Sequence, residues 1–156
     1  MNHSWNHDFP LDNRLHLPLN AYMRINESAT ATRFKALADP TRLRIVNLLR
    51  EEPLCVCNIE QVLEISQTSA SRHLAKLQSS GILASERRAQ WVYYRISEAF
   101  IRDHKTLLDY LYLEADNEQQ LRRDREILAR HVAEGTLCAV VLPVPSMHGE
   151  RASYIG

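Results

Sequence analysis

Apolar residues recur every three or four positions through residues 28–79, which predicts a succession of amphipathic helices. Two of these fall within residues 28–50, one over residues 54–63, and one over residues 67–79. The first two are expected to meet at Asp39-Pro40, because proline fits the first turn of a helix and interrupts a preceding one. Ser28 and Ser66 are suitable N-caps, and Gly81 is expected to end the last of the four helices in the C-cap position.

The pattern changes over residues 82–96, where β-branched and aromatic residues cluster as they do in strands. One predicted strand begins at Ile82, and the other covers residues 91–96. A polar, basic tip over residues 86–90 joins them, without an Asn-Gly or Gly-Gly pair that would fix the turn type. Helices followed by a two-stranded ribbon make a winged helix-turn-helix, in which residues 67–79 form the helix that would enter a groove of DNA.

Two further helical patterns cover residues 97–135, with an interruption expected at residues 116–118 and an end at Gly135. Their apolar surface exceeds what a small winged domain needs for its own core, so we expect two subunits to pair through it. The predicted fold class is mainly α with a small β-hairpin, a winged helix-turn-helix that is dimeric through its terminal helices. The predicted parts are an N-terminal arm over residues 1–27, a domain for DNA binding and dimerisation over residues 28–135, and a C-terminal tail over residues 136–156.

The composition is that of an ordinary globular domain, with 45% hydrophobic and 24% charged residues among 156. The four glycines are too far apart for a phosphate-binding loop, and no Ser/His/Asp set stands out, so we do not expect an enzyme. No apolar run reaches the ~18 residues of a membrane span, and no signal pattern opens the chain. Three cysteines, an odd number, favour reduced thiols in a cytoplasmic protein over a disulfide framework.

Charge is unevenly distributed in a chain whose formal net charge is zero. Residues 66–96 carry five basic residues and one acidic residue, whereas residues 97–135 carry six basic and nine acidic residues. The positive region coincides with the groove helix and the ribbon, where we expect phosphate contacts, and short polar side chains near the start of that helix suit base edges. The predicted DNA-contacting residues are Gln67, Thr68, Ser69, Ser71, Arg72 and His73 on the helix and Arg87 and Arg88 on the ribbon.

Cys55 and Cys57 stand one residue apart at the start of the third predicted helix. They are either two small buried side chains or two ligands for a soft, thiophilic ion. In a regular helix their side chains would point roughly 200° apart, so a single ion could reach both only if the first turn unwound. Such unwinding would disturb the support of the groove helix and would link ligand binding to DNA release. The pair could also close to a disulfide and act as a redox switch.

Four stretches of the chain together resemble the ArsR/SmtB family of metal-responsive winged-helix repressors. They are residues 34–45 (FKALADPTRLRI), 54–57 (LCVC), 66–74 (SQTSASRHL) and 91–95 (WVYYR). The resemblance covers about residues 33–97, and its Cys-Val-Cys stretch is similar to the arsenite-sensing branch. It implies an apo-dimer that represses transcription on double-stranded operator DNA, an inverted repeat, and leaves it when As(III) or Sb(III) binds. By this resemblance Cys55 and Cys57 are the metal ligands.

The ligand set stays open, because this chain has Glu60 where the arsenic motif often has a third cysteine. As(III) prefers three thiolates, and Cys138, the only other cysteine, is the candidate third ligand, from the same subunit or from its partner. Otherwise two thiolates with water or hydroxide must suffice. The arm lacks the N-terminal cysteines of cadmium and lead sensors, and His131 with Glu134 lacks the upstream partners of a zinc site. The alternative function is a redox-responsive or Cd/Pb/Zn-responsive repressor of the same fold.

Overall fold

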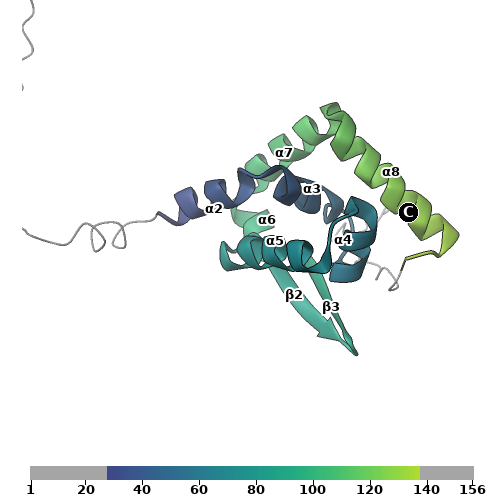
Figure 1. The fold of residues 1–156 in the computed structure, drawn as a ribbon. Coiled ribbons are helices and arrows are strands. Elements are labelled where there is room, and N and C mark those ends of the chain that lie inside the picture. The colour runs from purple at the N-terminus through teal and green to yellow at the C-terminus, as the bar shows by residue number, and fades with distance from the viewer. Residues whose placement is uncertain (1–27, 138–156) are drawn as a thin grey trace, which may run out of the picture.

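The computed structural model describes residues 28–137, in which helices pack into a body and the hairpin of a small antiparallel sheet projects from it (Figure 1). In chain order the elements are α2 (Ala29–Leu37), α3 (Pro40–Leu48), β1 (Leu54–Cys55), α4 (Val56–Leu63), α5 (Gln67–Ser79), β2 (Leu83–Arg88), β3 (Trp91–Ile96), α6 (Glu98–Asp103), α7 (Lys105–Asn117) and α8 (Gln119–Glu134). The predicted mainly helical fold with a β-hairpin is confirmed. No helix within residues 28–137 combines the length and the apolar character needed to span a membrane.

Local capping signals set most helix ends where the sequence predicts them. Asp39 caps α3 by accepting a hydrogen bond from the Arg42 backbone N–H at 2.9 Å, with Pro40 in the first turn. Ser66 caps α5 in the same way through the Ser69 N–H at 3.3 Å. Ser28 occupies the N-cap of α2 without a side-chain cap bond. The glycine expected to end α5 lies one position beyond the C-cap, with a left-handed φ of +76° that suits glycine.

The prediction of a helix over residues 54–63 is wrong at the N-terminal end. Leu54 and Cys55 form the short strand β1, and α4 starts only at Val56. β1 pairs antiparallel with β3, so that Leu54 faces Tyr94 and Cys55 faces Tyr93 across the ladder. The sheet therefore has three strands in the order β1-β3-β2, and the ribbon is joined to the segment that carries the two cysteines.

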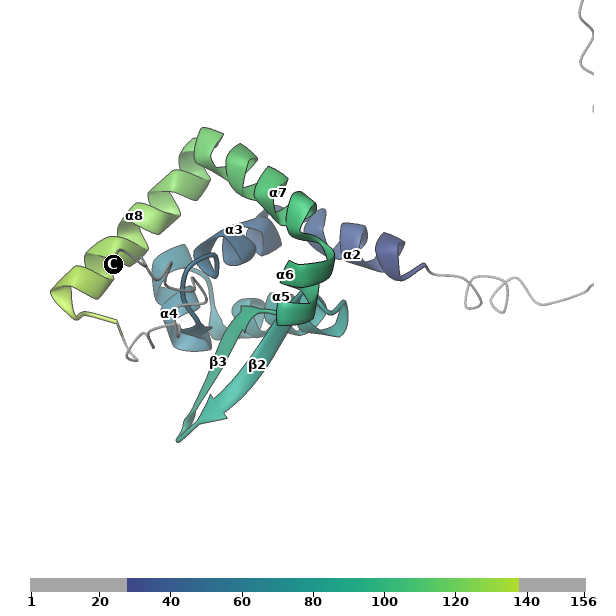
Figure 2. The same cartoon turned by 180° about the vertical axis from the view of Figure 1, so that it is seen from behind.

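β2 and β3 form the wing, a hairpin that projects from the body on the side away from α7 and α8 (Figures 1 and 2). Pairing runs from Leu83 opposite Ile96 to Arg88 opposite Trp91. The tip is shorter than predicted, because residues 86–88 belong to β2. Ala89 lies in this tight turn with a φ of +53°, a left-handed conformation that a residue with a Cβ adopts at a cost.

The core joins α3, α4 and α5 to the base of the wing. Its most completely buried side chains are Ile45, Val46, Leu54, Ile59, Val62, Leu74, Leu77 and Ile82. Each helix contributes apolar residues at helical spacing, which is why the sequence pattern located these helices. The groove helix α5 is thus fixed through one face only, and its opposite face stays open to solvent.

α7 and α8 form an angled pair that brackets α3 on the side opposite the wing (Figures 1 and 2). The predicted interruption between them is confirmed at Glu118, whose backbone is extended. A second break at His104, which separates α6 from α7, was not predicted. α8 is attached to α3 by polar contacts: Arg44 binds the buried carboxylate of Asp124 at 2.7 and 2.8 Å, and Asn47 donates to the Leu121 carbonyl at 2.9 Å.

Candidate functional site

The two cysteines lie at the junction of β1 and α4, and their sulfur atoms are bonded to each other. Cys55 is the N-cap of α4 with an extended backbone (φ −79°, ψ 165°), and Cys57 lies in the first turn of the helix. Their Cα atoms are 5.5 Å apart. The side chains converge because Cys55 is outside the helix, so the 200° separation expected for two helical residues does not apply.

This geometry corrects two expectations from the sequence. The two sulfur atoms meet while α4 is intact, so the first turn does not have to unwind to bring them to one ligand. The pair is also closed as a disulfide rather than present as two reduced thiols. Once reduced, two adjacent thiols on a fixed strand–helix junction form a donor set that suits a soft ion, since thiolate sulfur is the ligand such ions prefer.

The environment of the pair includes residues that sequence reasoning did not single out as site residues. Cys55 and Tyr93 are buried together, and Cys57 and Trp91 pack against them. The Asn58 backbone N–H donates to Cys55 Sγ at 3.4 Å, and the Asn58 Oδ1 atom lies 3.8 Å from Cys57 Sγ. The N-terminus of α4 therefore faces a sulfur atom, a position that favours negative charge on sulfur in the reduced state. Only the pairing of β1 with β3 would have revealed the two aromatic neighbours.

The predicted DNA-contacting residues of α5 fall into two groups. Gln67, Thr68, Ser71 and Arg72 are exposed along one face near the start of the helix. Ser69 is half-buried, and His73 is turned back to the N-cap of α3, where its Nδ1 lies 3.6 Å from Asp39. The structure thus brings four of the six together on an open face and gives His73 a contact inside the protein.

The basic residues of the wing also divide into residues paired within the protein and a residue that is open to solvent. Arg88 binds Glu86 on its own strand at 3.0 and 3.2 Å, and this bond holds the pKa of Glu86 below its ordinary value while raising that of Arg88. Arg95 is paired with Glu98 at 3.1 Å. Arg87 is exposed at the far end of β2, and within residues 28–137 its side chain donates to the Ala89 carbonyl and is in no ion pair. Unlike Arg88 and Arg95, Arg87 is therefore exposed without a carboxylate partner among the described residues.

The remaining candidate ligands are separated from the pair or already engaged. His131 Nδ1 is hydrogen-bonded to Thr136 Oγ1 at 2.7 Å, and Asp116 is paired with Arg50 and Arg125. Within residues 28–137 no cluster of three or more His, Cys, Asp or Glu side chains has the arrangement of a metal site. Cys138 lies outside the described residues, as do the predicted arm over residues 1–27 and the rest of the predicted tail.

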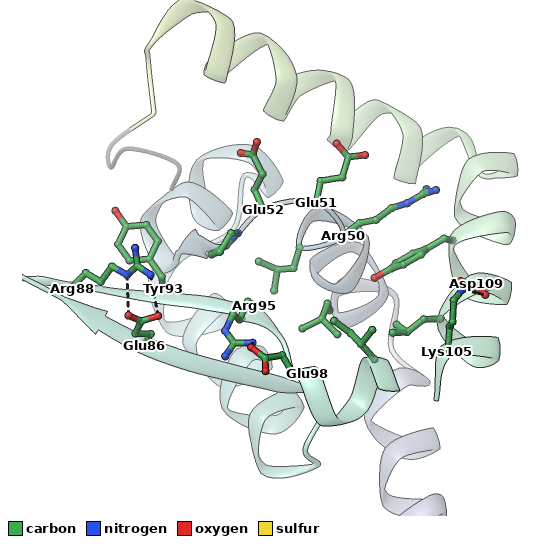
Figure 3. A pocket seen from close by; sticks show the side chains of 16 residues that line it. Arg50, Glu51, Glu52, Glu86, Arg88, Tyr93, Arg95, Glu98, Lys105 and Asp109 are labelled. Atoms are coloured by element: carbon green, nitrogen blue, oxygen red, sulfur yellow. Dashed lines mark hydrogen bonds and ion pairs between the residues drawn. The ribbon is translucent and has the colours of Figure 1, made fainter. Parts of the chain in front are cut away.

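A cleft of about 460 Å³ lies between the base of the wing, the loop before β1, and α6 with α7 (Figure 3). Its floor is apolar, and charged side chains from both walls line its rim (Figure 3). Arg88 with Glu86, Arg95 with Glu98, and Lys105 with Asp109 form ion pairs there. Burial beside this cleft raises the pKa of Tyr112 to about 12. Tyr93 connects the cleft to the cysteine pair, since it lines one and packs against the other.

Comparison with known proteins identifies the family of the chain. The family profile described as "Bacterial regulatory protein, arsR family" matches residues 39–85, from the cap of α3 into β2. The transcriptional activator HlyU of Vibrio cholerae is 33% identical over 100 residues, which cover 64% of this chain and 93% of HlyU. The chain belongs to the ArsR family. Membership in this family makes it a transcriptional regulator, and the resemblance seen in the sequence is confirmed.

Other ArsR-family proteins match over shorter segments. The arsenic resistance transcriptional regulator ArsR1 of Pseudomonas putida is 55% identical over 64 residues, 40% of this chain and 50% of that protein. The chain therefore spans about half the length of this relative. Among solved structures, the homodimeric winged helix-turn-helix DNA-binding domain Mb0332 of Mycobacterium bovis superposes with a TM-score of 0.50 at 32% identity, covering 56% of this chain and 79% of that domain. This likeness confirms the predicted winged helix-turn-helix.

Proposed function

We propose that this ArsR-family regulator is a homodimeric repressor that binds an inverted-repeat operator and leaves it when As(III) or Sb(III) binds Cys55 and Cys57. The observation that carries the proposal is the convergence of the two sulfur atoms at a junction hydrogen-bonded to the wing and continuous with the helix before α5. The similarity of the chain to an arsenic resistance regulator over 64 residues supports the choice of ligand.

DNA contact is assigned to the open face of α5. Gln67, Thr68 and Ser71 stand near the helix N-terminus, where groove-reading helices meet base edges, and Arg72 follows on the same face. Arg87 extends the positive surface along the wing. Because these contacts are partly electrostatic, operator affinity is expected to fall steeply as salt concentration rises.

Dimerisation is assigned to α2 and α7, which leave large apolar side chains exposed in the single chain. Phe34 on α2 is 54% exposed, and Tyr110 and Leu113 on α7 are 57% and 62% exposed. Tyr110 and Leu113 are three positions apart and share the face of α7 that points away from the core. Pairing these faces between two subunits would remove them from water, and it would place two α5 helices on one operator.

Release of the operator is assigned to the displacement that a bound ion causes at the junction of β1 and α4. An ion held by both sulfur atoms competes with the Asn58 N–H for Cys55 and moves Cys57 within the first turn of α4. Cys55 is also paired with Tyr93 in β3, so displacement of β1 acts on the wing, while displacement of α4 acts on α5 through a short turn. The ligand favours release only to the extent that it binds the DNA-free arrangement more tightly.

Operator binding by the reduced protein, measured by fluorescence anisotropy with and without arsenite, tests this function. Cys55→Ser and Cys57→Ser are expected to keep operator affinity and to lose release by arsenite, because each removes one of the two thiolates. Arg72→Ala serves as the opposite control, with weak operator binding and intact arsenite binding. Arsenite release that persists in both serine variants would contradict the proposal, and stronger release by Cd(II), Pb(II) or Zn(II) would assign the site to another ion.

The bonded sulfur atoms favour a second candidate, a thiol redox switch at the same junction. One peroxide molecule oxidises the two thiols to the disulfide and is itself reduced to two water molecules. Under this alternative the peroxide-treated protein and the dithiol protein differ in operator affinity, and arsenite has no effect beyond blocking the thiols. Titrating the operator with dithiol, peroxide-treated and arsenite-treated protein side by side distinguishes the two functions.

A further inference from the structure

Three polar side chains meet where α2 ends, α3 begins and α5 packs beside them. The Asp39 carboxylate, which caps α3, lies 3.5 Å from the Arg42 guanidinium through its Oδ2 atom. Arg42 also donates to two backbone carbonyls at the end of α2, those of Ala36 and Lys35, the latter at 3.0 Å. His73 of α5 completes the group, because its Nδ1 atom lies 3.6 Å from Asp39 Oδ1. Asp39, Arg42 and His73, the polar cluster, thus connect three helices.

The polar cluster adds to α5 a constraint that its apolar contacts do not supply. Ala70, Leu74 and Leu77 form one buried stripe at helical spacing, which holds α5 against the core. Hydrophobic burial is non-directional, so this stripe sets the depth of the helix more firmly than its angle. His73 lies at the edge of the stripe, half-buried, and its ring nitrogen faces one fixed carboxylate. The polar cluster therefore restricts rotation of α5.

The end of α5 that is assigned to DNA contact projects beyond the polar cluster. Gln67 is six positions before His73, which is about 9 Å along the helix axis. A rotation of about 10° at His73 would therefore move Gln67 by about 1.5 Å. Hydrogen bonds to base edges tolerate less than this, since their donor–acceptor distances vary by only about 0.5 Å. A small loss of restraint at His73 is enough to misplace the reading end of the helix.

We propose that His73 is a positioning residue for operator recognition: with Asp39 and Arg42 it fixes the angle of α5 to α2, and thereby the half-site spacing that the dimer accepts. The inference rests on the homodimeric repressor proposed above and concerns the geometry of its operator. α2 contacts α5 directly, and it carries Phe34, which is assigned to the dimer interface. The polar cluster is thus the polar link between the pairing helix and the groove helix of one subunit.

An operator of the wrong spacing tests this link. One base pair more or fewer between the half-sites displaces one of them by about 3.4 Å and turns it by about 35°. A dimer whose two α5 helices are held at a fixed angle should reject such a duplex. A dimer whose α5 helices can rotate should accept it more readily, at the cost of weaker binding to the correct duplex.

The experiment measures affinity and spacing preference together. Reduced, full-length wild-type protein selects a duplex from a random-sequence library, and two derivatives of that duplex carry one base pair more or one fewer between the half-sites. In anisotropy titrations the wild type should bind both derivatives about tenfold more weakly or worse. His73→Leu and Asp39→Ser should bind the selected duplex several-fold more weakly and reduce the discrimination to about twofold. Both substitutions keep the helices intact, because leucine is a good helix former and serine caps a helix as aspartate does.

The salt dependence of binding separates positioning from contact. Removing a side chain that neutralises a phosphate lowers the slope of log affinity against log salt by about one for each subunit. Arg87→Ala is the control for contact, since Arg87 is exposed on the wing, and it should show this lower slope while retaining the spacing preference. His73→Leu should show the opposite pattern. A lower salt slope in His73→Leu, or a spacing preference equal to that of the wild type, would overturn the proposal.

A double-mutant cycle tests whether His73 acts through Asp39. His73→Leu/Asp39→Ser should weaken operator binding no more than the weaker-binding single variant does, whereas additive losses would contradict a shared role. All variants are compared at a temperature at which circular dichroism shows them folded. Failure of the proposed function looks different, because the wild type would then select a duplex without repeated half-sites, or arsenite would not release the duplex that it selects. The salt slope and the cycle would still report on His73 in that case.

Discussion

Replacing Asp124 by asparagine removes the negative charge from the Arg44–Asp124 ion pair, which fixes α8 to α3. No other ion pair joins these two helices among the described residues. The Asp124 side chain is fully buried and accepts two hydrogen bonds from Arg44 and one from Gln120 at 2.8 Å. The bond to Asp124 raises the pKa of Arg44 in the wild type. Arg44 also stays charged after the substitution, because an arginine guanidinium does not lose its proton in proteins.

The expected loss of stability depends on how far the unpaired Arg44 guanidinium is buried. Breaking a fully buried ion pair costs about 3–5 kcal/mol. The Arg44 side chain is 22% exposed and can recover some hydration, so we expect a loss of about 2–3 kcal/mol in the free energy of unfolding. Asp109→Asn is the matched control, because the Lys105–Asp109 pair is exposed and should contribute less than about 1 kcal/mol.

Urea unfolding at one fixed protein concentration measures both variants, since dimerisation couples stability to concentration. Amide hydrogen exchange should show faster exchange in α8 while the core of α5 stays protected. The double variant Arg44→Met/Asp124→Leu should recover most of the stability, because it removes both charges. If Asp124→Asn lowers stability no more than Asp109→Asn does, the Arg44–Asp124 ion pair does not hold α8 to α3.

Three other predictions test the wing, the cleft and the groove helix. Ala89→Gly should stabilise the protein by about 0.5–1 kcal/mol, because glycine accepts the left-handed turn, and a thermal midpoint below that of the wild type would contradict it. Tyr112 has its folded-state pKa raised, so its contribution is complete below about pH 10 and lost as the pH rises toward 12; Tyr112→Phe should flatten stability in that window. Arg72→Ala should weaken operator binding by about tenfold to a hundredfold, with Lys105→Ala unchanged in an anisotropy titration.

Local chemistry made much of the fold predictable. Asp39 with Pro40, Ser66 and Gly135 mark helix ends through bonds to near neighbours in sequence, and the structure places the ends there. β1 was missed because two residues carry no strand pattern of their own and become a strand only by pairing with β3. The break at His104 was missed because the apolar period continues across it.

The candidate site was predicted less completely than the fold. The cysteine motif is local and identified the pair, but its geometry depends on β1, so the expected unwinding was wrong. His73 was grouped with the DNA-contacting residues by position, whereas its contact with Asp39 depends on how α5 packs near the start of α3. The bond between Arg44 and Asp124 joins residues 80 positions apart, and no periodic pattern signals such a pair.

The way in which α8 is attached to α3 determines which surface its detachment would expose. Many helices pack onto a protein through an apolar face, and their detachment then exposes hydrophobic surface that promotes aggregation. α8 is held by both kinds of contact, because Leu121 is buried and Ile127 and Leu128 pack against the apolar core beside the polar bonds from Arg44 and Asn47. Detachment of α8 would therefore uncover apolar surface, and the buried Arg44–Asp124 pair also protects the protein from aggregation.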